Sequence, residues 1–191
     1  TAFKDGVENS NTGVYGLNDI ISDNNGTFII GTYSNSILFN GSTTLSQTGG
    51  NIYLAKYTFA SGSFSFQSAV SSTGNAWSIA GNKILTLDGS NLILSSNVGS
   101  KAGTVTYGWP GISNSNTNSI EGVVLRINKS NLNAQELWTI NNGFRIGLSD
   151  IDLGTSGGNS VYFTGFGTGT GQIIVKKSST TYAVGQSHTL P

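Results

Sequence analysis

The chain contains no cysteine and no methionine, and it is poor in charge and in proline. Without cysteine it has no disulfide, no thiol nucleophile and no cysteine-ligated metal. Charged residues make up 9% of the chain, against roughly 25% in ordinary soluble domains. Lysine plus arginine and aspartate plus glutamate number nine each, so no basic field favours nucleic acid. The polar surface must come from Ser, Thr, Asn and Gly, as in many secreted proteins.

Long apolar runs are also absent, since no stretch approaches the roughly 18 residues that a membrane-spanning helix needs. The first residues are polar, and the chain begins with Thr1 rather than methionine. We therefore expect that something has been removed from the front, either a signal peptide or the preceding part of a longer surface protein. The expected location is extracellular or on the cell surface.

Three units of similar strand pattern follow one another along the chain. In each unit an aspartate precedes the first turn, and the three are spaced by 65 and 64 residues (88 − 23 and 152 − 88). A basic residue recurs in one register of each third strand. The aspartates are Asp23, Asp88 and Asp152, and the basic residues are Lys56, Arg126 and Lys176. The sequence predicts one β domain: an N-terminal segment, residues 1–13, and repeats over 14–73, 74–142 and 143–191.

Each unit is expected to hold four short antiparallel strands, and no segment sustains the apolar spacing of a helix. The predicted strands cover residues 19–23, 27–31, 52–57 and 64–70, then 83–88, 91–95, 122–127 and 134–140, then 150–153, 160–165, 172–177 and 181–185. Long connections over 32–51 and 96–121 differ in length between units, which is typical of surface loops.

The run from Asn18 to Tyr33, with Gly49-Gly-Asn-Ile-Tyr-Leu-Ala-Lys-Tyr57 after it, resembles the SBBP-type β-propeller repeats of bacterial and archaeal secreted or surface proteins. Those repeats pair a D-x-x-G-N-x-Y-V-T-G stretch with a later D-x-F-V-A-K stretch. The third unit matches through residues 158–165 and 173–176, whereas Ser95 of the second unit replaces the family's glycine. The resemblance implies propeller-like four-stranded blades and no fixed activity.

Three blades leave open strand edges, because closed propellers have about 4–8 blades. The chain could be part of a larger propeller, subunits could join through their edges, or the sheets could pack as a β-sandwich instead. The segment 1–13 is either a polar leader or a strand donated to a neighbouring copy.

Residues that could carry catalysis are few. His188 is the single histidine, and the Gly-x-Ser-x-Gly match around Ser156 lacks the strand-to-helix setting of a nucleophile elbow. The glycine-rich run 165–171 misses the dinucleotide-binding spacing. The turn aspartates could bind calcium, but their more ordinary role is to hydrogen-bond their own backbone. We expect no enzyme, no cofactor and no metal, with calcium as the one alternative.

Candidate binding residues are Lys56, Arg126 and Lys176, which could line a channel or cover strand ends, and Trp109, whose long loop suggests an exposed ring for sugar stacking. Candidate glycosylation sites are Asn25, Asn40 and Asn128, each in an Asn-x-Ser/Thr sequon. The sequence favours a non-catalytic structural or assembly protein, with a filament of self-associating copies as one form. A carbohydrate-binding adhesin or lectin that uses the two long loops is the alternative.

Overall fold

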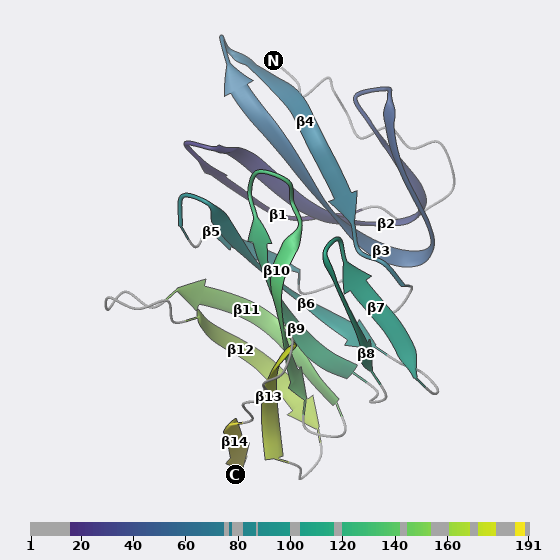
Figure 1. The fold of residues 1–191 in the computed structure, drawn as a ribbon, viewed down its shortest axis with the longest axis vertical. Coiled ribbons are helices and arrows are strands. Elements are labelled where there is room, and N and C mark those ends of the chain that lie inside the picture. The colour runs from purple at the N-terminus through teal and green to yellow at the C-terminus, as the bar shows by residue number, and fades with distance from the viewer. Residues whose placement is uncertain are drawn as a thin grey trace.

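The computed structural model describes residues 16–74, 77, 82–86, 88–99, 104–116, 120–141, 145–153, 161–168, 172–178 and 186–189. Over these residues the chain is built from β-strands and turns, with no helix, which confirms the all-β prediction (Figure 1). Nothing in this part of the chain is a helix long and apolar enough to cross a membrane.

A four-stranded antiparallel sheet forms the upper part of Figure 1, with strand order β1-β2-β3-β4. Its strands are β1 (Gly16–Asp23), β2 (Gly26–Phe39), β3 (Thr43–Ala60) and β4 (Ser63–Ser71). These contain all four strands predicted for the first unit. The expectation of a surface loop over residues 32–51 is wrong, however, because β2 and β3 stay paired as far as Phe39 and Thr43. Asn40 and Gly41 make the turn with positive φ angles of 50° and 61°.

The end of the β2–β3 hairpin supplies side chains to an apolar cluster on one face of this sheet. Ile37 and Phe39 are fully buried there together with Tyr53 and Tyr57. The Phe39 ring lies 5.3 Å from Tyr53 and 5.5 Å from Phe66, centroid to centroid. Because this hairpin end buries large apolar side chains, the residues between the predicted strands form part of the core and not a free loop.

The second sheet has eight strands, and four of them correspond to the predicted second unit. These four are β5 (Lys83–Thr86), β6 (Asn91–Gly99), β9 (Ile120–Asn128) and β10 (Ala134–Asn141), each antiparallel to the next. The remaining strands are β11 (Arg145–Leu153), β12 (Val161–Thr168), β13 (Gln172–Ser178) and β14 (Gln186–Thr189). A separate hairpin, β7 (Val105–Trp109) with β8 (Ile112–Asn116), lies within the second predicted loop.

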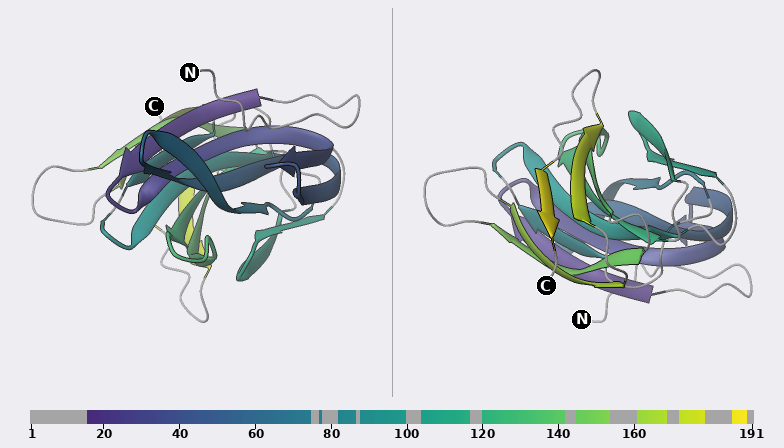
Figure 2. Two further views of the ribbon diagram at one scale, coloured as in Figure 1. Left: turned by 90° about the horizontal axis from the view of Figure 1, so that it is seen from above. Right: turned by 90° about the horizontal axis from the view of Figure 1, so that it is seen from below.

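The third predicted unit does not form a four-stranded meander. β11 pairs with β12, but β13 pairs with β10 of the preceding unit instead of with β12. β10 pairs with β9 on one side, and without β13 the backbone amides and carbonyls on its other side would have no strand partner. β13 supplies that partner. The fourth strand expected at 181–185 lies outside the described residues, and β14 begins at Gln186. The sheets are therefore neither closed nor propeller-like (Figure 2).

The main core lies between the two sheets and takes side chains from both. Phe28 and Ile30 of β2 meet Leu92 and Leu94 of β6 in this core, and all four are fully buried. Alternate residues point the other way, so Ile93 joins a separate cluster with residues of β11. Central strands thus bury both faces, because successive side chains leave a strand on opposite sides.

β11 is attached to the eight-stranded sheet mainly by side chains. Its backbone makes one parallel pair with β9, between Arg145 and Ile120. The Asn97 amide of β6 completes the attachment: its Nδ2 donates to the Leu148 carbonyl at 2.9 Å and its Oδ1 accepts from the Leu148 amide at 2.6 Å. A buried asparagine thus takes the place of a strand neighbour.

The same register feature occurs at the basic residue of each of the first two units, one in each sheet. Lys56 pairs with Phe28, and a one-residue bulge in β4 follows it; Arg126 pairs with Ile93, and a one-residue bulge in β10 follows it. These bulges are local kinks that increase strand twist. The basic residues of the first two units therefore occupy matching backbone positions, as their sequence register predicts.

A second shared bulge relates the β1–β2 hairpin to the β11–β12 hairpin. The register shifts between Leu17 and Asp19 in the first, and between Leu148 and Asp150 in the second. Both shifts lie in a Gly-Leu-x-Asp-Ile sequence, residues 16–20 and 147–151. The register therefore aligns Asp150 with Asp19, and the alignment of Asp152 with Asp23 is wrong, since Asp152 lies within the paired hairpin opposite Tyr162.

Candidate functional site

Two of the three predicted aspartates, Asp23 and Asp88, lie in turns that meet a buried lysine between the two sheets. Lys129, which follows β9 and is 2% exposed, forms an ion pair with the Asp23 carboxylate and donates to the Asp88 carbonyl. Lys56 Nζ donates to the Lys129 carbonyl at 3.1 Å and lies 5.7 Å from the centroid of the Phe28 ring. This polar cluster joins the first and second units, and sequence reasoning missed Lys129.

The predicted set of basic binding residues is not brought together. Lys56 points into the space between the sheets, toward Lys129. Arg126 lies between Leu125 and Ile127, both in the main core, so strand alternation directs it to the opposite face. The side chain of Lys176 lies outside the described part; its backbone pairs with Thr139 of β10. Lys56 and Arg126 therefore do not line a common channel.

Asp23 and Asp88 accept hydrogen bonds from backbone amides of their own turns. Asp23 Oδ1 accepts from the Asn25 amide at 2.7 Å, and Asp88 Oδ1 accepts from the Ser90 amide at 2.6 Å. Hydrogen bonds from the Asn91 side chain and from Ser90 hold the pKa of Asp88 below its ordinary value. Across the described residues, no three His, Cys, Asp or Glu side chains gather where they could hold a metal ion. Since a lysine ammonium already neutralises Asp23, a divalent cation gains little there.

Trp109 is a core residue, and the expectation of an exposed stacking ring is wrong. It is 2% exposed, and its indole nitrogen donates to the Leu132 carbonyl at 2.8 Å. Trp77 lies 6.4 Å from it and 5.6 Å from Tyr107, with edge-to-face geometry in both pairs. The alternation of Val105, Tyr107 and Trp109 is a strand signal that could have indicated burial.

A buried tyrosine and carboxylate form a second polar pair beside Trp77. The Tyr107 hydroxyl donates to Glu121, which is 3% exposed, and accepts from Asn114 Nδ2 at 3.1 Å. Burial first, and the Glu121 charge second, raise the pKa of Tyr107 above its ordinary value. A protonated phenol that satisfies a buried carboxylate is a structural element.

The catalytic candidates named from sequence gain no partners from the described residues. Ser156 lies outside them, and so does part of the glycine-rich run 165–171. His188 lies in β14 opposite Ile173, and its side chain is not among those described.

The three sequons differ in accessibility. Asn25 Nδ2 donates to the Gly89 carbonyl at 2.7 Å, and Asn128 Oδ1 accepts from both the amide and the hydroxyl of Ser130. Asn40 is exposed at the tip of the β2–β3 turn. A glycan acceptor must offer its amide to solvent, so Asn40 is the best placed of the three.

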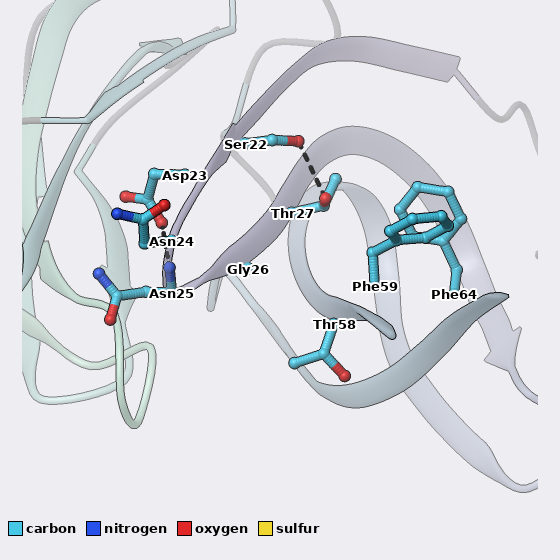
Figure 3. Close-up of a pocket in the computed structure, with 9 residues that line it drawn as sticks. All are labelled: Ser22, Asp23, Asn24, Asn25, Gly26, Thr27, Thr58, Phe59 and Phe64. Atoms are coloured by element: carbon cyan, nitrogen blue, oxygen red, sulfur yellow. Dashed lines mark hydrogen bonds between the residues drawn. The ribbon is translucent and has the colours of Figure 1, made fainter. Parts of the chain in front are cut away.

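An open pocket of about 530 Å³ lies where the β1–β2 turn faces the β3–β4 hairpin (Figure 3). Its polar side comes from the turn, and its apolar side comes from Phe59 and Phe64, which are 61% and 37% exposed. Their ring centroids are 4.9 Å apart. The lining residues are Ser22, Asp23, Asn24, Asn25, Gly26, Thr27, Thr58, Phe59 and Phe64. The sequence signal for this pocket was the pair of phenylalanines on either side of the β3–β4 turn. Strand prediction alone does not tell whether such phenylalanines are exposed or belong to the core.

β12 is an open edge with exposed aromatic side chains. Among the described strands it pairs with β11 alone. Every residue from Tyr162 to Thr168 is exposed, and Tyr162, Phe163 and Phe166 keep 60%, 38% and 51% of their surface accessible. An exposed edge strand with large apolar side chains is a template for pairing with another chain.

Comparison of the chain with protein-family models, with curated proteins and with solved structures finds no match in any of the three. The resemblance to SBBP-type repeats therefore stays a prediction. Function must be argued from the chemistry of these surfaces.

Proposed function

We propose that this chain is a non-catalytic extracellular or cell-surface structural protein whose copies associate through open strand edges. The single observation that carries the proposal is β12, an edge strand that exposes three aromatic side chains, Tyr162, Phe163 and Phe166. The exposed parts of these three side chains forgo burial worth about 25 cal/mol per Å². A protein partner that covers them recovers this free energy.

The partner of β12 is a second copy of this chain, joined through β4. Among the described strands β4 pairs with β3 alone, so each sheet ends in an open edge. β4 lies in the upper half of Figure 1 and β12 in the lower half, toward opposite ends of the longest axis. A head-to-tail contact between unlike edges continues from copy to copy as a filament when its rotation does not close a ring, and this is the form that we propose.

Internal repetition supports the same role. The matching bulges after Lys56 and Arg126, and the matching Gly-Leu-x-Asp-Ile bulges at 16–20 and 147–151, support descent of the three units from one four-stranded unit. Repeated β units expose edges wherever the array stops, and such arrays need caps or neighbours. The low charge of the chain, 9% of residues, leaves little like-charge repulsion between copies.

The test is electron microscopy and light scattering of the full chain beside a Tyr162→Lys/Phe166→Lys variant. We expect the parent to form filaments and the variant to remain monomeric, because edge lysines must be desolvated for strand pairing. Asn24→Lys is the control for added charge, since Asn24 is exposed in the turn between β1 and β2 and lies in no strand. Its assembly should equal that of the parent.

Two outcomes would overturn this proposal. A parent chain that remains monomeric at all concentrations would show that β12 is no assembly edge. Filaments that survive in the lysine variant would place the contact elsewhere. A third variant, which lacks residues 1–13, tests whether that segment donates the strand that pairs with β12. If this variant no longer forms filaments, the segment is the partner of β12 and β4 is not.

Carbohydrate binding through the two long loops is the weaker candidate. The residues 32–51 are strand and turn, with Ile37 and Phe39 in the core. The β7–β8 hairpin within 96–121 likewise buries Tyr107 and Trp109. Neither segment therefore presents the exposed aromatic ring that loop-based sugar recognition requires.

A further inference from the structure

We propose that a second copy of this chain covers the outer face of the β11–β12 hairpin with its own strand β1. On this outer face, Tyr162 and Phe166 leave β12 on one side, because alternate residues of a strand point the same way, and they are 60% and 51% exposed. On β1, Leu17 and Ile20 are 65% and 52% exposed. The contact extends the proposed assembly and rests on its premise that copies of the chain associate.

The β1–β2 and β11–β12 hairpins share one register, as their matching bulges show. Counted from the bulge, Leu17 and Ile20 of β1 occupy the positions of Leu148 and Ile151 of β11. The cross-strand partners agree, since Leu17 and Leu148 each lie opposite a glycine. Directly opposed residues project to the same face of a sheet. The two leucine–isoleucine pairs therefore lie on equivalent faces of their hairpins.

In the third unit this equivalent face is covered. Leu148 and Ile151 are 1% and 5% exposed, and they belong to one buried cluster with Ile93, Val124 and Ile140 of the second unit. The same residue types at the same register positions of β1 remain exposed. β1 therefore lacks the cover that β11 receives from the second unit.

The position of Ile93 identifies what the cover of β1 would be. Ile93 and Phe28 occupy matching positions, because each lies opposite the basic residue of its unit. Tyr162 holds this position in the third unit, since Tyr162 and Phe28 both lie two pairs beyond the bulge of their hairpins. Phe28 packs against the second unit and Ile93 against the third. By the same rule, Tyr162 packs against the equivalent face of another copy, and β1 carries that face.

Two carboxylates on the outer face are compatible with this contact. Asp150 is the equivalent of Asp19, whose Oδ2 accepts from the Ile84 amide of the second unit at 3.1 Å. Asp150 Oδ1 accepts from the next amide of its own strand at 3.0 Å, as Asp19 Oδ1 does. In the proposed contact, the other oxygen of Asp150 accepts from a backbone amide of the second copy. Asp152 lies one pair from the end of the β11–β12 ladder, at the rim of the face.

The edge and the outer face of β12 serve two different contacts. Pairing of β12 with β4, as proposed above, extends a sheet sideways and leaves the outer face of the hairpin uncovered. A sheet buries its apolar face against a second layer of structure. Strand β1 of a second copy supplies that layer.

The experiment uses thiol cross-linking, because the chain contains no cysteine and an introduced thiol is unique. Ser22→Cys places a thiol two residues from Ile20 on the same face of β1. Thr164→Cys places one between Tyr162 and Phe166 on the outer face. Both parent residues are exposed, so neither change should unfold the chain. The two full-length variants are mixed, treated with a short bis-maleimide and digested, and the linked peptides are identified by mass spectrometry.

Two further thiol variants are each mixed with Thr164→Cys as references. Ser65→Cys lies on the open edge of β4 and reports the edge contact of the proposed function. Ser90→Cys lies in the exposed turn before β6 and measures random collision. We expect a 22–164 link well above the 90–164 background. Adding Ile20→Lys to the Ser22→Cys chain should abolish that link, because a lysine must be desolvated in an apolar contact.

The possible results separate the two contacts. A 65–164 link without a 22–164 link would overturn this inference and leave the proposed edge contact standing. A 22–164 link without a 65–164 link would support the face contact and remove β4 as the partner of β12. Absence of both links above background would overturn both contacts. A 22–164 link that survives Ile20→Lys would overturn the apolar contact between β1 and β12.

Discussion

Replacing Lys129 by methionine tests whether the buried ion pair between the two sheets stabilises the fold. Methionine keeps an unbranched stem of similar length and removes the charge. In the parent, the Lys129 side chain is 3% exposed and that of Asp23 is 20% exposed. The change leaves the Asp23 carboxylate without its cation and the Asp88 carbonyl without its donor.

The expected loss follows from these exposures. Removing one partner of a fully buried ion pair costs about 3–5 kcal/mol. Asp23 retains a fifth of its surface, so water can partly solvate the abandoned carboxylate. We therefore expect Lys129→Met to lower the free energy of unfolding by about 2–3 kcal/mol. The Lys129→Met/Asp23→Asn pair should recover part of the loss, because a neutral amide costs less to bury.

Urea unfolding followed by tryptophan fluorescence measures this loss. The midpoint should fall while the m-value stays unchanged, since the surface exposed on unfolding is the same. Lys83→Met, a change on β5 outside the cluster, is the control and should cost under about 0.5 kcal/mol. A Lys129→Met loss as small as that of the control would refute the reasoning. A double variant with strictly additive losses would refute the coupling between Lys129 and Asp23.

Three further predictions follow from single sites. Trp109→Ala should cost about 3–5 kcal/mol in urea unfolding, because it empties a fully packed core position; a loss under about 1 kcal/mol would mean that the ring is exposed. Gly165→Ala should lower the melting temperature, since its Cβ would collide with the Gly147 carbonyl across the bulge; an unchanged melting temperature would contradict that register. Stability should fall as pH rises above about 10, where unfolded tyrosines ionise. Burial raises the pKa of Tyr53 to about 12, so the folded state keeps this proton longer than the unfolded state does. Tyr53→Phe should flatten this alkaline slope in pH-dependent unfolding, and an unaltered slope would exclude Tyr53 as its source.

The first two units were largely predictable from sequence because their strands are local patterns. Runs of Ile, Leu, Val and Phe between Gly, Asn and Asp turns placed strands at every predicted position of both units. The register of Lys56 and Arg126 was also visible, since residues at one position of a repeat share one backbone setting. The all-β class follows from the same patterns.

The site residues were much less predictable. Trp109 looked exposed because its segment was read as a loop, although a short hairpin returns it to the core. Lys129 lies 106 residues from Asp23 along the chain, and no local pattern relates the two. The pocket has the same origin, because Asn24 and Phe64 line one pocket only after the β1–β2 turn and β4 fold into one sheet.

The sequence by itself determined the strands, the turns between them and the low charge of the surface, because each depends on neighbouring residues. Only the tertiary structure decided which strands pair across units. β13 joins β10 rather than β12, and this one choice opens the β12 edge and exposes its aromatic rings. Strand pairing is decided by the free energy of long-range contacts, and several partners are equally compatible with one alternating pattern.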